Sequence, residues 1–421
     1  MRILTTLFFA LVGFSLVAQE AEKTLQELYQ EGNAAYEAKD YKTYLERMRE
    51  IDEMRPNYPV VVYKLAGAYA LNKRKARSIQ KLRQSILMDA TVDFENDEDF
   101  KNIRRYKGYN RLLELKDRLG KKEVHDEVYR TIDVGMLHPE SFVVLDDGSM
   151  LMGSIREKKI VKIDADNQVT DWLQTDMAVM GMEVSNGYLW VATAALPEMK
   201  GFEASMRGKS LVLQVDLETA GIVQGMDYDA KSVIGDIELD KQSRIWLSNS
   251  MTPFLSRDHT DTTYVPGAFV WKQFDLEMTH FNLQGLTLNE DESILYFADY
   301  IKGIYKVNVE TDDVDPVFAP PTSLLKGIDG LYHYNTSLIA IHNGVKPYRI
   351  MQYFLDEAGE NIIMERVINR GGDSLGEPTN GQVKDGYFYY LANSPWQAYD
   401  KYMNLDPTKV KPIEIRRIKL D

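Results

Sequence analysis

One pattern recurs six times along this chain: a short apolar segment, a polar turn, and a second apolar segment that ends at a polar residue. The copies begin at Glu140, Gly181, Gly235, Gly285, Gly330 and Gly381, at steps of 41, 54, 50, 45 and 51 residues. One blade of a β-propeller is a four-stranded sheet of roughly 40–50 residues, and each copy is typical of the inner half of a blade. The sequence therefore predicts a six-bladed β-propeller.

The rest of each blade is also visible, because segments such as 160–164 and 303–309 alternate apolar and polar residues with a period of two. A closed propeller leaves no blade edge unpaired. The segments 127–134 and 413–420 flank the repeats and have the same alternation. We expect these two segments to be neighbouring strands of one shared blade, within a propeller that spans 125–421.

The first 18 residues have a different character. Arg2 precedes an apolar run over 3–17, and polar residues begin at Gln19. A run this short followed by a polar stretch indicates a cleavable signal peptide, and it predicts a secreted or periplasmic protein without a membrane span. The chain has no cysteine. We therefore expect neither lipid attachment at a mature N-terminal cysteine nor disulfides, and stability must come from the core.

Residues 22–120 have a helical pattern. The stretch 31–45, followed by Pro56, resembles a tetratricopeptide repeat, and a second copy starts 34 residues later if Gly32 is matched to Ala66. The second copy lacks the terminal proline, and Tyr44 stands where a small residue is usual. The expected fold is thus a multidomain α plus all-β chain, with tetratricopeptide-like helices before the propeller. Such an array either packs on its own propeller or binds a protein partner.

The overall charge argues against nucleic acid as a partner. The net charge is −14 and the isoelectric point is about 5.1. Binding to a polyanion would need a local basic patch, for which 73–77 is the candidate. A solvated helix face explains that segment more simply.

Oxygen-bearing side chains recur where each predicted inner strand starts. In a propeller these strand ends surround one mouth of the central channel, where a small-molecule ligand or substrate can bind. Carboxylate and amide oxygens suit a hard cation such as Ca²⁺, which also relieves the repulsion between nearby carboxylates. The residues at these positions are Glu140, Met182 (or its neighbour Gly181), Asp236, Gln284, Asp329 and the 377–380 group with Glu377 and Asn380.

Residues from about 130 onward resemble the gluconolactonase and senescence-marker-protein superfamily of six-bladed propellers. The resemblance rests on 138–140, on 284–288 with 295–299, and on 327–331. It implies a lactonase or esterase in which a divalent metal, most simply Ca²⁺, polarises a carbonyl. The metal ligands implied are Glu140, Asp236, Gln284 and Asp329.

The same resemblance implies that Asp329 doubles as base or nucleophile, and that His138, His280 or His342 transfers a proton. For each histidine, an imidazole at a strand end or in a loop is the simpler explanation. The chain departs from the family at two positions. Gln284 stands where an asparagine is usual, and Gly235-Asp236 replaces an Asn-Asp pair. Both departures affect the metal geometry.

Three classes of function follow from these patterns: a metal-dependent hydrolase, a ligand- or protein-binding propeller with a structural ion, and a scaffold protein. The loops after the second strands of the last two blades contribute His342, Asn343 and Trp396. The pairs Asn343-Gly344 and Ser394-Pro395 are typical of turns, so we interpret these loops as turn motifs, with His342 a further candidate for the channel lining. A fold of this kind hosts many activities, so it does not choose between the classes.

Overall fold

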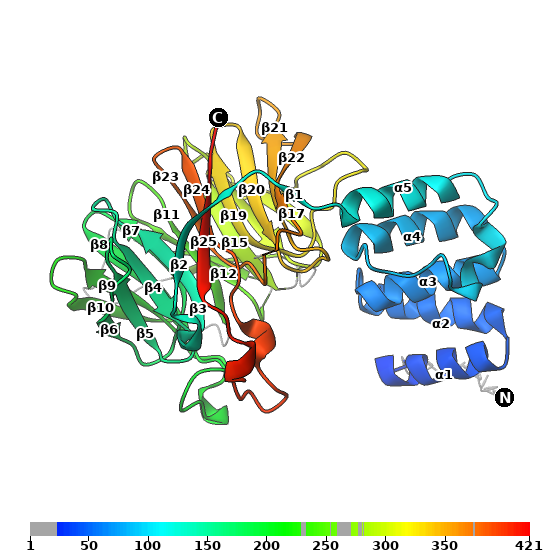
Figure 1. The fold of residues 1–421 in the computed structure, drawn as a ribbon, viewed down its shortest axis with the longest axis horizontal. Coiled ribbons are helices and arrows are strands. Elements are labelled where there is room, and N and C mark those ends of the chain that lie inside the picture. The colour runs from blue at the N-terminus through cyan, green and yellow to red at the C-terminus, as the bar shows by residue number, and fades with distance from the viewer. Residues whose placement is uncertain are drawn as a thin grey trace, which may run out of the picture.

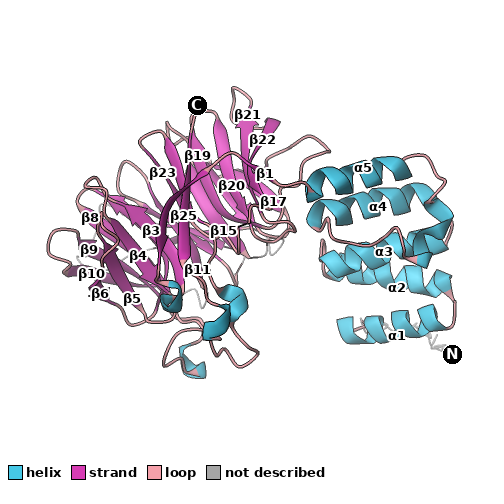
Figure 2. Ribbon diagram, in the orientation of Figure 1, coloured by secondary structure: helices cyan, strands magenta, loops and turns pink. Residues whose placement is uncertain are grey.

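The structure is a computed structural model that describes residues 23–228, 233–252, 254–258, 271–276, 280, 282–373 and 375–421. It consists of a helical arm and a β-propeller (Figures 1 and 2). The predicted signal peptide over 1–18 lies outside the described residues. None of the helices in the described part is long and apolar enough to cross a membrane.

The arm is a stack of antiparallel helices, as the helical pattern predicts. Thr24 begins the first helix with a capping box, in which its side chain and that of Glu27 bond each other's backbone amides. Met48, Ile51, Val61 and Leu65 fill the core between successive helices. The tetratricopeptide nature of these helices stays a prediction. They are α1 (Leu25–Glu37), α2 (Tyr41–Met54), α3 (Pro59–Leu71), α4 (Lys75–Met88), the 3₁₀ helix η1 (Glu98–Ile103) and α5 (Tyr109–Gly120).

The described strands after the arm form six antiparallel sheets, which confirms the six-bladed propeller. The first blade contains β3 (Pro139–Val144), β4 (Met150–Ser154), β5 (Lys159–Ile163) and β6 (Val169–Gln174), and the second contains β7 (Ala178–Ser185), β8 (Tyr188–Ala194), β9 (Ser210–Asp216) and β10 (Ile222–Tyr228). The third contains β11 (Ile234–Leu239), β12 (Ile245–Asn249), β13 (Phe254–Asp258) and β14 (Trp271–Asp275). The fourth contains β15 (Leu283–Leu288), β16 (Ile294–Asp299), β17 (Gly303–Asn308) and β18 (Val314–Pro316). The fifth contains β19 (Ile328–Tyr334), β20 (Ser337–His342), β21 (Arg349–Leu355), β22 (Ile362–Arg370). The sixth contains β23 (Gly381–Lys384), β24 (Tyr387–Leu391), β25 (Ile413–Lys419) and β2 (Glu127–Ile132). Short 3₁₀ helices lie at η2 (Gly135–Leu137), η3 (Ala204–Met206), η4 (Trp396–Ala398) and η5 (Pro407–Lys409).

The propeller closes as the flanking segments predict. β2 pairs with β25 from Glu127↔Arg417 to Ile132↔Ile413, so the two ends of the domain share the sixth blade. Figure 1 shows β25 in red beside the teal β2. The six inner strands contact one another in a ring, from β3 through β7, β11, β15 and β19 to β23 and back to β3. Their amino-terminal ends therefore surround one mouth of the channel.

Five of the inner strands carry the same β-bulge. In β3, Pro139 pairs with Ser154 and Phe142 pairs with Met152. Two residues of the inner strand therefore lie opposite one residue of β4 between these pairs. The same shift occurs in β7, β11, β15 and β19. A bulge redirects the side chains of its extra residues. The bulge pairs are Glu140-Ser141, Met180-Gly181, Gly235-Asp236, Gln284-Gly285 and Asp329-Gly330.

These bulges explain the glycine that recurs in the sequence repeat. A Cβ on Gly285 would lie 2.3 Å from the backbone nitrogen of Leu331 in the next blade, and one on Gly235 would lie 2.7 Å from the carbonyl oxygen of Leu283. At Gly285 and Gly235 the neighbouring inner strands thus approach each other more closely than a side chain allows. The repeat is a requirement of blade packing around the channel.

The arm packs against the fifth blade through backbone hydrogen bonds. The amide of Ala90 donates to the carbonyl of Lys346 at 2.8 Å, and the amide of Lys346 donates to Met88 at 2.9 Å. The guanidinium of Arg349 donates to the carbonyl of Leu87 at 2.6 Å. Beyond α5, the strand β1 (Glu123–Val124) adds to the outer edge of the same blade beside β22. The arm is therefore tied to its own propeller at several points.

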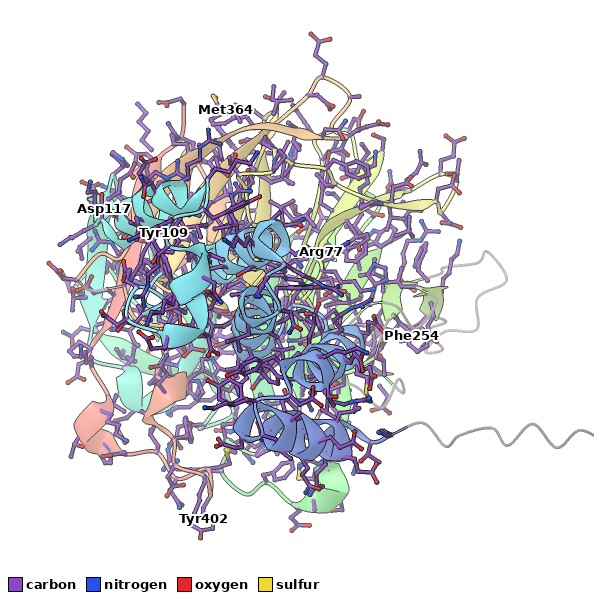
Figure 3. The ribbon with its side chains drawn as sticks, turned by 90° about the vertical axis from the view of Figure 1, so that its right-hand side faces the viewer. Arg77, Tyr109, Asp117, Phe254, Met364 and Tyr402 are labelled. Atoms are coloured by element: carbon purple, nitrogen blue, oxygen red, sulfur yellow. The ribbon has the colours of Figure 1, made fainter. Side chains whose placement is uncertain are left out.

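Figure 3 turns the molecule so that the arm faces the viewer, with Arg77 of α4 and Tyr109 and Asp117 of α5 labelled. In that view the helices lie in front of the propeller, whereas Figure 1 shows them beside the blade that contains β21 and β22. The arm thus covers one side of the propeller and reaches the loops at the ends of the fourth and fifth blades, which carry Ile301 and Lys346.

Candidate active site at the channel mouth

Glu140 and Asp329 hold the first position of the bulge in β3 and β19. Each is followed by a small residue, Ser141 or Gly330, at the second position. Burial raises the pKa of Glu140 well above its ordinary value, and the charge of Asp329 raises it further. The bulge thus brings together two carboxyl groups from blades that are far apart in the sequence.

The carboxyl group of Glu140 is fixed by the loop after β24. The indole Nε1 of Trp396 donates to Oε2 of Glu140 at 2.7 Å, and the hydroxyl of Ser394 lies 3.4 Å from the same oxygen. That hydroxyl donates to the carbonyl of Pro139 at 2.8 Å. The other carboxyl oxygen of Glu140 accepts no hydrogen bond from the described residues and remains available to a ligand.

Asp329 is held in a similar way by the loop after β20. The amide Nδ2 of Asn343 donates to Oδ2 of Asp329 at 2.5 Å, and Oδ1 of Asn343 accepts from the hydroxyl of Tyr300 at 3.0 Å. The second oxygen of Asp329 has no hydrogen-bond partner within the described part of the chain. Both carboxyl groups therefore have one oxygen held and one oxygen open.

Burial raises the pKa of Asp329 to about 8, and the charge of Glu377 contributes to the rise while Asn343 opposes it. Burial likewise raises the pKa of Glu377. Carboxyl groups in such surroundings are ionised together only at a large cost in free energy. Near neutral pH the cluster must therefore hold protons or a cation.

The two other predicted ligands differ in their surroundings. Gln284 occupies the first bulge position of β15, and its Nε2 donates to Oδ1 of Asn282 at 2.7 Å, which leaves its carbonyl oxygen open. Asp236 occupies the second position of its bulge, after Gly235. The carboxylate of Asp236 accepts hydrogen bonds from the backbone amide of Ile237 at 2.9 Å and from the backbone amide of Leu286 in the next blade at 3.4 Å. Burial raises the pKa of Asp236 to about 7.

The three candidate histidines lie in packed surroundings. His138 is fully buried, its Nδ1 lies 2.9 Å from the hydroxyl of Tyr399, and its ring meets Trp396 edge-on at 4.4 Å. Burial lowers the pKa of His138 to about 3, so the ring is neutral at physiological pH. His138 thus supports the tryptophan that holds Glu140.

His342 lies between the carbonyl of Lys326 and the hydroxyl of Tyr353, and burial lowers its pKa to about 3. His280 packs against Tyr305 with ring centroids 4.4 Å apart. Both rings belong to the interior of the fourth and fifth blades. Of the other predicted channel residues, Glu377 forms an isolated bridge with Ser394, and the carbonyl of Asn380 accepts from the amide of Leu391 at 2.9 Å.

The donor set suits a hard cation in its chemistry. The carboxyl groups of Glu140 and Asp329 each have an open oxygen, and Gln284 has an open amide oxygen, which are ligands that Ca²⁺ prefers. Among the described residues, however, no three acidic or histidine side chains are grouped closely enough to hold a metal ion by themselves. A cation here would rely on two carboxylates, an amide oxygen and water or substrate oxygens.

The sequence analysis missed a second acidic group on the neighbouring inner strands. Glu183 in β7 and Glu238 in β11 lie opposite Trp190 and Trp246 in their blades. Burial and then the charge of Asp236 raise the pKa of Glu183 to about 8, and burial and then Glu183 raise the pKa of Glu238 well above its ordinary value. The available signal was a glutamate that follows the apolar start of β7, and in β11 a glutamate two residues after Asp236.

We expect Glu183→Gln to stabilise the protein at pH 8 and to have little effect at pH 5. The folded state binds the proton of Glu183 up to about pH 8, whereas the unfolded chain releases it near its ordinary value of 4.5. Wild-type stability therefore falls as the pH rises through this window, and glutamine removes that loss. A gain of about 2 kcal/mol at pH 8 would raise the melting temperature by roughly 4–8 °C. Glu218→Gln, in the turn after β9, is the control, and an equal gain at both pH values would contradict the expectation.

Comparison with known proteins finds similarity in structure. No protein-family model matches the chain, and no curated protein matches it either. A catalytically inactive virginiamycin B lyase from Staphylococcus aureus is 12% identical, with a TM-score of 0.47, over 72% of this chain and 100% of that one. A luciferin-regenerating enzyme is also 12% identical, with a TM-score of 0.48, over 70% and 95%. A putative glucose dehydrogenase from Thermus thermophilus is 12% identical, with a TM-score of 0.48, over 70% and 99%. Similarity at this level assigns no activity to this chain.

Proposed function

We propose that the channel mouth is the active site of a divalent-cation-dependent hydrolase of lactones or esters. The observation that supports this most is the half-buried pair Glu140 and Asp329, because each carboxyl group is oriented by the protein through one oxygen and open through the other. Bound near Glu140, Asp329 and Gln284, a cation such as Ca²⁺ would supply the positive charge that polarises a substrate carbonyl.

In this proposal the chain's own groups orient the site and move the proton. Trp396 and Asn343 keep the carboxyl groups of Glu140 and Asp329 in place, and Tyr300 keeps Asn343 in place. A carboxyl group whose pKa lies near the working pH is an efficient acid or base. Asp329, whose second oxygen is open, would take up the proton of an attacking water once a bound cation keeps its carboxyl group ionised.

The second candidate function is a propeller that binds a small molecule without catalysis, with a structural ion at the channel. One observation favours it: Gly235 offers no side chain at the first bulge position of β11, so this blade supplies no ligand there for a catalytic cation. Both candidates use the same mouth of the channel. They differ in whether a bond of the ligand is broken.

We propose that the protein works outside the cytoplasm, in the periplasm or as a secreted protein, because 1–18 has the pattern of a signal peptide. We also keep a protein partner for the arm as part of the proposal. The arm has a hollow of about 420 Å³ that includes Tyr36, Tyr44 and Tyr63 with Asp97 and Asp99 in its lining. Aromatic and acidic side chains together suit a basic peptide segment.

A panel of lactones and aryl esters tests the proposed function. The purified protein is first treated with a chelator and then assayed with Ca²⁺, Mg²⁺, Mn²⁺ or Zn²⁺. We expect turnover of at least one substrate that is absent after chelation and returns when the cation is added. No turnover above the uncatalysed rate with any cation across the panel would contradict the hydrolase and favour the binding function.

A further inference from the structure

A cavity of about 520 Å³ lies where the arm meets the propeller, and the channel mouth does not account for it. One wall is the α2–α3 loop with the end of α4, and the other is formed by propeller loops after β16, before β19 and after β20. Its size falls within the range of small-molecule sites. It exists because the arm docks at this place.

The walls of this junction cavity are fixed by hydrogen bonds. Asn57 donates through Nδ2 to the carbonyl of Ile301 at 3.3 Å and accepts from Nε2 of Gln84 at 2.6 Å, so the α2–α3 loop is joined to both the propeller and α4. The backbone bond from Lys346 to Met88 closes the other side. A site whose walls are already in place binds a ligand without a cost for ordering them.

The lining combines apolar surface with positive charge. Its apolar members are Met54, Pro56, Pro59, Met88, Ile301 and Val345. Its charged members are Arg55 and Lys326, and the described part of the chain contributes no aspartate or glutamate to the lining. The protein as a whole has a net charge of −14, so the positive charge of this lining is opposite in sign to that of the average surface. It favours an apolar ligand that carries a negative charge.

Lys326 is half-buried, and its ammonium makes no ion pair or hydrogen bond with the described residues. The charges of Asp299 and Asp52 favour its ionised form, although neither carboxylate forms an ion pair with it. Asp52 pairs with Lys81 at 2.7 Å, and Asp299 accepts the backbone amides of Ile301 and Lys302, both at 2.9 Å. A half-buried cation without a partner is costly, and an anionic group beside it removes that cost.

Burial lowers the pKa of Lys326 to about 8, and the positive charge of Lys81 adds to the effect. The charges of Asp299 and Asp52 oppose this lowering of the pKa, and the side chain is still mainly charged at pH 7. Arg55 is exposed, with its guanidinium 5.8 Å from the ring centroid of Tyr58. The two cations of the lining therefore differ in their exposure to solvent.

We propose that the junction cavity binds a small molecule with an apolar body and an anionic head group, with Lys326 as the counter-ion. The cavity also adjoins the candidate active site, because Tyr300 lines it and donates to Asn343, which holds Asp329. Binding in the cavity requires no hydrolysis. This proposal can therefore be tested separately from the proposed function.

Calorimetric titration of the full chain with decanoate and with decan-1-ol at pH 7 tests this proposal. The two probes share an apolar chain and differ in charge, and neither has an ester bond to cleave. We expect decanoate to bind one site per chain at least about tenfold more tightly than the alcohol. Lys326→Met should remove this preference while keeping the apolar contact. Ile301→Trp should fill the cavity and weaken both probes.

Lys42→Met, on an exposed face of α2, is the matched control and should leave both affinities unchanged. Melting temperatures close to that of the wild type establish that the variants are folded. The proposal is overturned if decanoate and decanol bind the wild type equally. It is also overturned if Lys326→Met keeps the preference for decanoate, or if the folded Ile301→Trp variant binds decanoate as tightly as the wild type.

Discussion

Replacement of Asp329 by asparagine is expected to lower turnover of the best lactone or ester substrate by at least about 100-fold, without loss of stability. Asparagine has the shape of aspartate, and its side-chain oxygen can still accept the hydrogen bond from Asn343. It does not take up a proton, however, and it lacks the negative charge that holds a cation. Because burial raises the pKa of Asp329, the neutral amide is also easier to bury at pH 8. The kinetic constants and melting temperatures of both proteins give the comparison.

Two matched variants separate this effect from a general one. Asp385→Asn makes the same chemical change in the turn after β23, and it should leave turnover unchanged. Gln284→Asn shortens the open amide at the channel mouth by one methylene group and should keep or raise turnover, because the amide oxygen stays available as a ligand. If Asp329→Asn retains most of the wild-type turnover, Asp329 is not the base.

Gly285→Ala is expected to destabilise the protein by about 3 kcal/mol or more, which lowers the melting temperature by roughly 6–12 °C. The added Cβ would lie 2.3 Å from the backbone nitrogen of Leu331 and 2.6 Å from the carbonyl oxygen of Asp329. Neither contact can be relieved by rotating a side chain, so the fourth and fifth blades must move apart. The movement would also displace Asp329.

Gly120→Ala is the control, because a Cβ at that position has no atom within 4 Å. Its melting temperature should stay near that of the wild type. Thermal unfolding followed by circular dichroism measures both variants. A Gly285→Ala protein that melts within 2 °C of the wild type would contradict the view that the bulge glycines fix the spacing of the inner strands.

The sequence predicts the architecture because the repeat and the packing have one cause. Three of the five bulged inner strands have a glycine at the second bulge position, and Gly181, Gly285 and Gly330 therefore recur in the sequence repeat. Strand alternation also predicts the pairing of β2 with β25, which the structure confirms. These features are local in the sequence or repeat along it.

The side chains that complete the site could not be predicted in the same way. Trp396 and Asn343 come from loops whose Ser-Pro and Asn-Gly pairs are explained by turns alone. Their contacts with Glu140 and Asp329 depend on how far each loop reaches over the channel. Alignment of the sequence repeats also treats Asp236 as equivalent to Glu140. In the structure, however, Glu140 is the first residue of its bulge and Asp236 is the second residue of its own, where its carboxylate accepts a hydrogen bond from the amide of Leu286.

Calorimetric titration of Ca²⁺ into chelator-treated protein at pH 7.5 tests the central claim most directly. The proposed function predicts one binding event per chain, accompanied by release of protons from the carboxyl groups and by a rise in melting temperature, and lost in both Glu140→Gln and Asp329→Asn. Proton release is measured by repeating the titration in buffers of different ionisation enthalpy. Absence of heat and of a thermal shift in the wild type, or unchanged binding in Asp329→Asn, would contradict a cation site at Glu140 and Asp329.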